Sequence, residues 1–357
     1  MRTWAAPRRL SKSVRIFAAA AGVTAGIAGS GGDARADYAG IGSWLPGSFG
    51  SLAATPLQPG WGLGLIYYHA NSTAGGDVAA QRAIQFGSRT TNLTVSLDAQ
   101  MKAILDIGVF APSYTFAQPV LGGQFSINVL AMYGRMDAKI DANVTGALGP
   151  IGFATNRSVE DARMVWGDVF IQPTWRINQG VNNYMVYGMF NLPVGTYDPH
   201  RLANLGLGHW YVDVGGGYTY FNPKSGWEFS AVTGFTYNFI NPDIQYQNGV
   251  DWHLDWGVSK FVTKDVHIGL VGYVYQQLTA DSGSGAVFGD FKSRVFAAGP
   301  QIGYLFPVGD MQGYLNLKGY KEFDAENRPE GWNVWLSFAL SPKAAAAQAA
   351  KSGIPLK

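Results

Sequence analysis

The sequence predicts an all-β chain, a transmembrane antiparallel up-and-down β-barrel of about 12 strands that follows a cleaved signal peptide. Three observations lead to this fold class. Segments with period-two alternation recur along most of the chain, and the connections between them alternate between short and long. Only 14% of the 357 residues are charged, against about 25% in a typical soluble domain, whereas aromatic residues make up another 14%.

Residues 1–36 have the form of a secretory signal peptide. Basic residues lie between Arg2 and Arg15, a stretch of small apolar residues follows at 16–28, and Ala34-Arg35-Ala36 offers a small-x-small cleavage site. The mature part contains no apolar run long enough for a transmembrane helix. An export signal without such a helix predicts the Gram-negative outer membrane.

The segment 37–59 is rich in Gly, Pro and Ser and too broken for a long element, so we expect a periplasmic lead-in. The barrel is then predicted over 60–340. Residues 341–357 form an Ala/Lys-rich tail, which we expect in the periplasm, and both chain termini are expected on that side.

Twelve segments within 60–340 have the alternation of strands. They are 61–70, 92–109, 124–140, 164–177, 183–192, 209–220, 227–239, 250–261, 266–278, 291–306, 311–322 and 332–340.

The clearest pair of strands lies in residues 208–239, around the turn 222–226. One face carries bulky residues such as Trp210, Tyr220, Trp227 and Tyr237, and the other carries polar and small ones. A strand from 210 to 220 spans roughly 33 Å, which at a tilt of about 40° covers the apolar belt of an outer-membrane barrel. The bulky face is therefore predicted to face lipid, although a hairpin of a soluble sandwich alternates in the same way.

The connections support the membrane alternative. Short turns such as 222–226, 262–265 and 307–310 alternate with longer, polar loops such as 141–163, 193–208 and 279–290. Short turns on one side and long loops on the other are typical of outer-membrane barrels.

Composition excludes several functions. A formal net charge of +2 provides no strong attraction to nucleic acid, and the absence of Cys excludes disulfides and thiolate metal sites. No HExxH or GxSxG motif is present among the residues. His253 and Asp255 share one strand face, which could suggest a metal or acid–base site, but we interpret them as polar residues that line a lumen. We therefore predict no enzyme, no catalytic residues, no metal and no cofactor.

If the polar face of each strand points inward, the barrel interior carries charges of both signs. The candidate lumen-lining residues are Asp98, Lys102, Asp168, Arg176, Asp213, Glu228, His253, Asp255 and Lys318. They could line a conducting lumen or bridge across it as a salt-bridged plug. Aromatic side chains, among them Trp166 and Tyr211, are expected between them.

Several turn motifs resemble those of the outer-membrane β-barrel family associated with the meta-pathway of phenol degradation. They are Leu45-Pro46-Gly47, Pro59-Gly60, the stretch from Leu192 to Tyr197, the stretch from Phe306 to Asp310, and the closing strand from Trp332 to Phe338. The resemblance covers nearly all of the mature chain. It implies passage of hydrophobic or aromatic compounds across the outer membrane and no catalytic residues.

The sequence thus predicts a channel for passive uptake of small hydrophobic compounds, aromatic ones among them. The expected partners are these solutes, outer-membrane lipids and the barrel-assembly machinery. The alternative is a plugged structural or adhesive barrel whose long extracellular loops bind a partner. An outer-membrane lipase is a third, weaker hypothesis.

Overall fold

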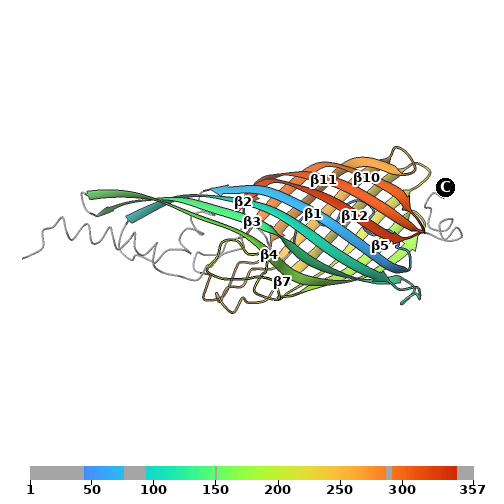
Figure 1. Cartoon of the computed structure of the whole chain (residues 1–357), viewed down its shortest axis with the longest axis horizontal. Helices are drawn as coiled ribbons and strands as arrows, with labels where there is room; N and C mark the ends of the chain where they lie inside the picture. Colours follow the sequence, from blue (N-terminus) through green and yellow to red (C-terminus); the bar gives the residue numbers. More distant parts are fainter. Residues whose placement is uncertain (1–43, 76–93, 149–150, 287–291, 344–357) are drawn as a thin grey trace, which may run out of the picture.

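In the computed structural model, which describes residues 44–75, 94–148, 151–286 and 292–343, the strands close into one barrel (Figure 1). Each strand is antiparallel to its neighbours in sequence, and β1 closes the ring against β12. This confirms the predicted architecture. The described residues include no helix that is long and apolar enough to cross a membrane.

The strands are β1 (Gly60–Gly75), β2 (Thr94–Thr115), β3 (Gln124–Leu148), β4 (Ile151–Gln179), β5 (Asn182–Leu192), β6 (Tyr211–Asn222), β7 (Trp227–Asn238), β8 (Asp251–Phe261), β9 (Val266–Gln277), β10 (Arg294–Val308), β11 (Met311–Glu326) and β12 (Glu330–Pro342). The predicted signal peptide, the first part of the lead-in and most of the tail lie outside the described residues.

Strands β3 and β4 are much longer than predicted, and together with β2 they extend beyond one end of the barrel (Figure 1). Most of the segment 141–163, expected to be a loop, is strand: the β3–β4 ladder continues to the pair Leu148 and Ile151. Polar residues are compatible with a strand here because the outer face of this extension lies beyond the apolar belt. The chain enters β1 and leaves β12 at the opposite end of the barrel.

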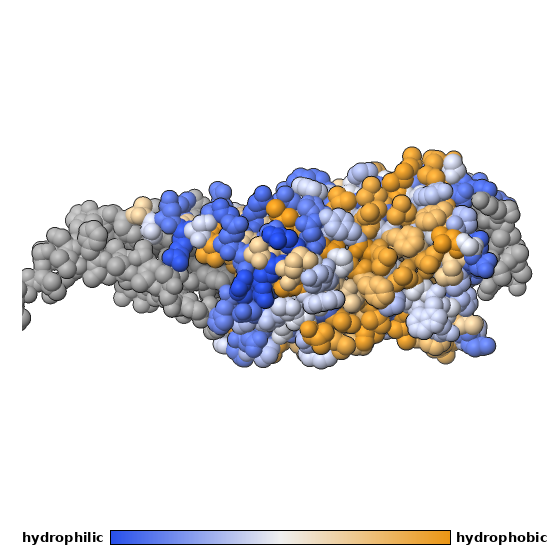
Figure 2. All heavy atoms as spheres, in the orientation of Figure 1, coloured by the Kyte–Doolittle hydropathy of each residue, from blue (hydrophilic) through white to orange (hydrophobic). Residues whose placement is uncertain are grey.

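Outward-facing apolar side chains form the belt that Figure 2 shows on the barrel wall. In the predicted hairpin, Trp210, Val214, Trp227 and Tyr237 are about half exposed, as expected for a lipid-facing surface. The polar residues between them are buried inside.

A β-bulge reverses one predicted face. Ala131 pairs with Val169, but Tyr133 pairs with Trp166, so β4 has one extra residue at this point. The alternation of faces is therefore shifted at the bulge. Side chains before it point to the opposite face from the one that the pattern after it predicts. Trp166, predicted to point inward, lies outside and is 60% exposed, whereas Asp168 is fully buried.

Glycines make room for an aromatic side chain inside the barrel. Gly215 of β6 and Gly234 of β7 pair directly, and Tyr187 of β5 lies over both. A Cβ at Gly215 would lie 2.3 Å from Thr233 O and 2.6 Å from the Tyr187 hydroxyl. The glycines in this hairpin thus let a tyrosine fill the interior.

We expect Gly215→Ala to destabilise the barrel by about 1–3 kcal/mol, because the new methyl group overpacks this contact. The measurement is the temperature at which the folded, fast-migrating form is lost in detergent electrophoresis. Gly188→Ala is the matched control, because its Cβ would meet only ordinary contacts at 3.9 Å. Equal unfolding temperatures for the two variants would contradict the prediction.

Candidate functional site: the barrel interior and its plug segment

The interior of the barrel is occupied by the residues that precede the first strand. We call residues 44–59 the plug segment. Their hydrogen bonds go to inward-facing side chains of β3, β6, β7, β8, β10 and β11. This corrects the expected position of the lead-in: its described part lies in the lumen and not in the periplasm.

Two opposite charges hold the backbone of the plug segment at Gly47 and Phe49. The two carboxylate oxygens of Asp255 accept the amides of Gly47 and Phe49, each at 2.9 Å. Lys318 Nζ donates to the carbonyl oxygens of the same two residues at 2.6 and 3.1 Å. Since Asp255 comes from β8 and Lys318 from β11, this clamp connects two sides of the barrel through the segment.

Glu228 makes a second attachment. Its Oε1 accepts the amide of Leu52 at 2.9 Å, and its Oε2 accepts the hydroxyl of Ser51 at 2.6 Å. Ser51 also lies 2.6 Å from the hydroxyl of Ser259 and accepts a hydrogen bond from Gln301 at 2.7 Å. Buried polar groups are costly unless they are paired, and here the segment and the wall satisfy each other.

The two ends of the segment are fixed as well. Trp44 stacks on His253 with ring centroids 3.7 Å apart, and His253 Nε2 lies 2.9 Å from the carboxylate of Asp213. At the other end, the side-chain amide of Gln124 donates to Leu57 O at 2.6 Å and accepts from Leu57 N at 2.7 Å.

The motif Leu45-Pro46-Gly47 turns the chain inside the lumen. Gly47 has a φ of +86°, which favours glycine, and a Cβ there would lie 3.1 Å from the ring of Tyr320. The family resemblance rests partly on this motif. The conformation of the plug segment therefore requires it.

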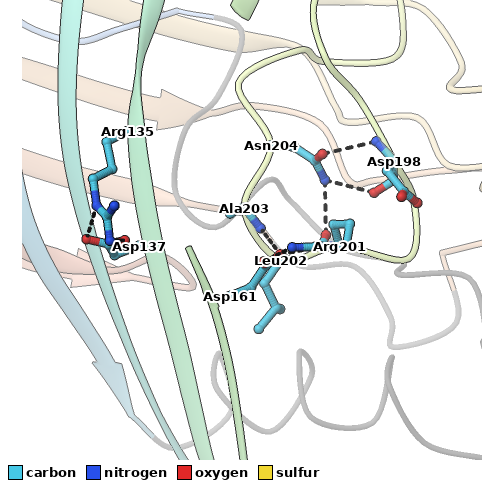
Figure 3. A network of polar contacts seen from close by, with 8 residues as sticks. All are labelled: Arg135, Asp137, Asp161, Asp198, Arg201, Leu202, Ala203 and Asn204. Atoms are coloured by element: carbon cyan, nitrogen blue, oxygen red, sulfur yellow. Dashed lines mark hydrogen bonds and ion pairs between the residues drawn. The ribbon is translucent and has the colours of Figure 1, made fainter. Parts of the chain in front are cut away.

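A second group of residues closes the interior at the end with the extended strands. We call residues 193–210, between β5 and β6, the mouth loop. The carboxylate of Asp168 accepts the amides of Gly195 and Leu207 at 2.9 and 3.3 Å. Asp161 forms an ion pair with Arg201 and accepts the amides of Leu202 and Ala203, each at 3.0 Å (Figure 3).

The mouth loop covers an apolar inner wall. Its buried Leu202 and Leu205 belong to one cluster with Ala103 and Leu105 of β2 and Met136 of β3. The polar face of β2 consequently points outward at this level.

The predicted lumen residues divide accordingly. Asp168, Arg176, Asp213, Glu228, His253, Asp255 and Lys318 have buried side chains inside the barrel. Lys102 is exposed on the outer face of β2, because Ala103 and Met101 take the inner face there; its predicted lumen position is wrong. Asp98 lies in β2, but its side chain lies outside the described part.

Among the predicted lumen residues that the structure describes, His253 and Asp213 contact each other directly at 2.9 Å, but the other buried charges do not form the salt-bridged plug considered from the sequence. Asp255, Lys318 and Glu228 bind the backbone and a serine of the plug segment. The sequence analysis did not predict the plug segment. Two features of the sequence indicated it: charges expected inside the barrel without partners, and Trp44, a residue of a type that is usually buried, in the stretch just before the first strand. Among the described residues, no group of three or more His, Asp or Glu side chains is placed to hold a metal ion.

The contact of Ser51 with Ser259 allows a direct test of the plug position. Because the natural chain has no Cys, Ser51→Cys with Ser259→Cys introduces the only two thiols. Their hydroxyls lie 2.6 Å apart, so we expect a disulfide of about 2.05 Å under oxidising conditions. Mobility of the unreduced protein measures it. Ser51→Cys with Ser158→Cys, which places the second thiol on exposed β4, should remain reduced. If the thiols of both double variants stay reduced, the position of the plug segment is contradicted.

Comparison with known proteins gives a family and a fold. A structural match is an outer-membrane channel from Pseudomonas putida F1, with 14% identity, 83% of this chain and 99% of that chain covered, and a TM-score of 0.60. A FadL homologue from Pseudomonas aeruginosa matches at 10% identity over 86% of this chain and 97% of that chain, with a TM-score of 0.39.

No curated protein matches this sequence. A family model whose description refers to the MetA-pathway of phenol degradation matches residues 86–338. This match confirms the resemblance seen in the turn motifs and covers more than half of the chain. The chain therefore belongs to the MetA-pathway phenol degradation family and has the fold of outer-membrane β-barrels.

Proposed function

We propose that this protein is an outer-membrane channel for passive uptake of small hydrophobic compounds, aromatic ones among them, with both chain termini in the periplasm. Membership of the family and the fold shared with an outer-membrane channel support the general role. The class of solute rests on the lining of the interior.

The observation that carries the proposal is a packed cluster of aromatic and apolar side chains that reaches from the mouth loop to Leu45 of the plug segment, and we call it the aromatic compartment. Tyr68 packs on Trp335 with centroids 4.6 Å apart, and Tyr273 packs on Tyr320 at 5.0 Å. Rings of this kind offer apolar faces and polar tips to an aromatic solute. The buried apolar residues of the mouth loop continue the same cluster.

A small cavity lies where this compartment meets the plug segment. Its volume is about 30 Å³, and its lining includes Leu45 and Pro46 of the segment, Tyr68 and Tyr273 of the wall, and Glu322. A cavity of this size holds about one water molecule, so a solute that takes this path needs the segment or the mouth loop to shift. Thermal motion supplies this shift in a passive channel.

The lumen residues then have a structural role in transport: Asp255, Lys318 and Glu228 hold the segment, and Asp168 holds the mouth loop. No catalytic step is part of the proposal. Outer-membrane lipids surround the belt, and the barrel-assembly machinery inserts the barrel.

The second candidate function is a plugged structural or adhesive barrel whose extended strands and long loops bind a partner. The filled lumen and the protruding β2, β3 and β4 favour it. The two candidates differ in whether the lumen ever conducts.

Uptake by cells tests the channel directly. A strain that lacks this protein should take up a panel of small aromatic compounds more slowly, and the natural chain should restore the rate. Ser51→Cys with Ser259→Cys should restore it only after a membrane-permeant reductant is added, because the disulfide holds the plug segment in place. Unchanged uptake across the whole panel in the deletion strain would refute the proposed solute class.

Conductance in planar bilayers separates the two candidates. Asp255→Asn removes the charge that accepts two amides of the plug segment, which weakens attachment by about 1–3 kcal/mol, so brief openings should become more frequent. Asp137→Asn, a matched change on the outer face of β3, should leave the frequency unchanged. Silence of all three proteins, natural chain included, would support the plugged barrel.

A further inference from the structure

The lipid-facing wall of the barrel contains a groove that the channel function does not use. It has a volume of about 620 Å³ and crosses strands β11, β12, β1, β2, β3 and β4. Aromatic rings border it: Tyr67, Phe110, Tyr133 and Trp166 all point outward and are 41–60% exposed.

A missing side chain creates the groove. In the register of the sheet, Tyr67, Gly108, Tyr133 and Trp166 form one row across β1 to β4. Gly108 is therefore the gap in a row of rings. A Cβ there would meet only Tyr133 O at 3.7 Å, so the wall itself leaves the space open. In the next row, Leu65 and Phe110 are followed by the small Ala131, which extends the gap.

A charged row borders the groove at the end nearer the extended strands. His69, Asp106 and Arg135 are paired across β1, β2 and β3, two residues or about 7 Å from the aromatic row. Asp106 accepts the hydroxyl of Tyr67 at 2.5 Å and lies 2.8 Å from His69 Nδ1. Arg135 pairs with Asp137 at 2.8 Å, and 51% of its side chain stays exposed.

The apolar groove, its aromatic border and the charged row follow one another as the acyl chain and the phosphate head group do in a phospholipid. Aromatic side chains mark the boundary between the apolar belt and the head groups in membrane barrels. The hydrocarbon of the bilayer is the medium that meets this wall, and an exposed guanidinium at its border is suited to a phosphate.

We propose that the groove around Gly108 is a binding site for one acyl chain of a phosphorylated membrane lipid, whose phosphate lies against Arg135. The inference rests on the membrane location of the barrel but not on the transport of solutes. The site would hold a lipid at a fixed position on the wall, in contrast to the lipids that exchange freely around the rest of the belt.

Photolabelling in vesicles tests the proposal. The full chain is reconstituted in phosphatidylcholine with a small fraction of phosphatidylglycerol that carries a photoreactive acyl chain, and labelled peptides are mapped by mass spectrometry. We expect labels to concentrate on the outward residues of β1 to β4. Gly108→Trp and Ala131→Trp fill the groove and should each lower that labelling roughly tenfold, as expected for loss of a specific site.

The matched control is Leu270→Trp on β9, which adds the same side chain to an exposed position away from the groove and should not change the labelling. Arg135→Gln should reduce labelling by the phosphatidylglycerol probe more than labelling by a photoreactive phosphatidylcholine without net charge. Loss of the folded band in electrophoresis identifies a variant that does not fold. If Gly108→Trp or Ala131→Trp fails in this way, the labelling of the other variant tests the proposal.

Two outcomes would overturn the proposal. Labels spread evenly around the barrel would mean ordinary contact with bulk lipid, and unchanged labelling in the folded Gly108→Trp and Ala131→Trp variants would mean that the groove is not the site. Uptake of aromatic solutes by Gly108→Trp stays normal if only the lipid site is lost, so failure of this proposal and failure of the channel remain distinguishable.

Discussion

Reciprocal hydrogen bonding between the charged barrel wall and the backbone of the plug segment is the interaction on which the interior depends. Asp255 and Glu228 are buried inside the barrel, where an unpaired carboxylate would be strongly unfavourable. The plug segment has an equal requirement, because a broken chain without helix or sheet leaves its amides and carbonyls unpaired. The segment needs the charged wall, and the wall needs the segment. Without the plug segment, or without the charged side chains that bind it, the lumen would fill with water.

The same principle explains why the inner face of the barrel changes character along its axis. Around the plug segment, the inner wall is polar because it bonds to backbone. Under the mouth loop, the inner wall of β2 and β3 is apolar because it packs against Leu202 and Leu205, and the polar face turns to water outside. The direction of a strand's polar face thus depends on what fills the interior at that level, and not only on the presence of lipid outside.

These differences set the limit of sequence reasoning. Alternation located nearly every strand, and the hairpin around residues 222–226 was predicted with the correct faces because lipid and lumen lie on its two sides. Lys102 was misplaced because local alternation cannot reveal that a distant loop covers the inner wall. Trp166 was misplaced because a bulge leaves the residue pattern almost unchanged while it reverses the faces. The plug segment was missed because most of its partners lie more than 150 residues away in the sequence, as Thr219 and Asp255 do.

The chemistry of the plug attachment also restricts the path of a solute. The attachments at Gly47, Phe49 and Leu52 are hydrogen bonds to backbone groups, and only a molecule with donors and acceptors can replace them. A small hydrocarbon has neither, so it cannot compete for Asp255 or Lys318. Its apolar partners are those of the aromatic compartment, where Leu45, Pro46, Tyr68 and Tyr273 line a cavity that is too small for it until the segment shifts. Water is the species able to loosen the polar part of the segment. In the channel proposed above, an apolar solute therefore meets the plug segment on its apolar side, and the segment shifts when water replaces its polar attachments.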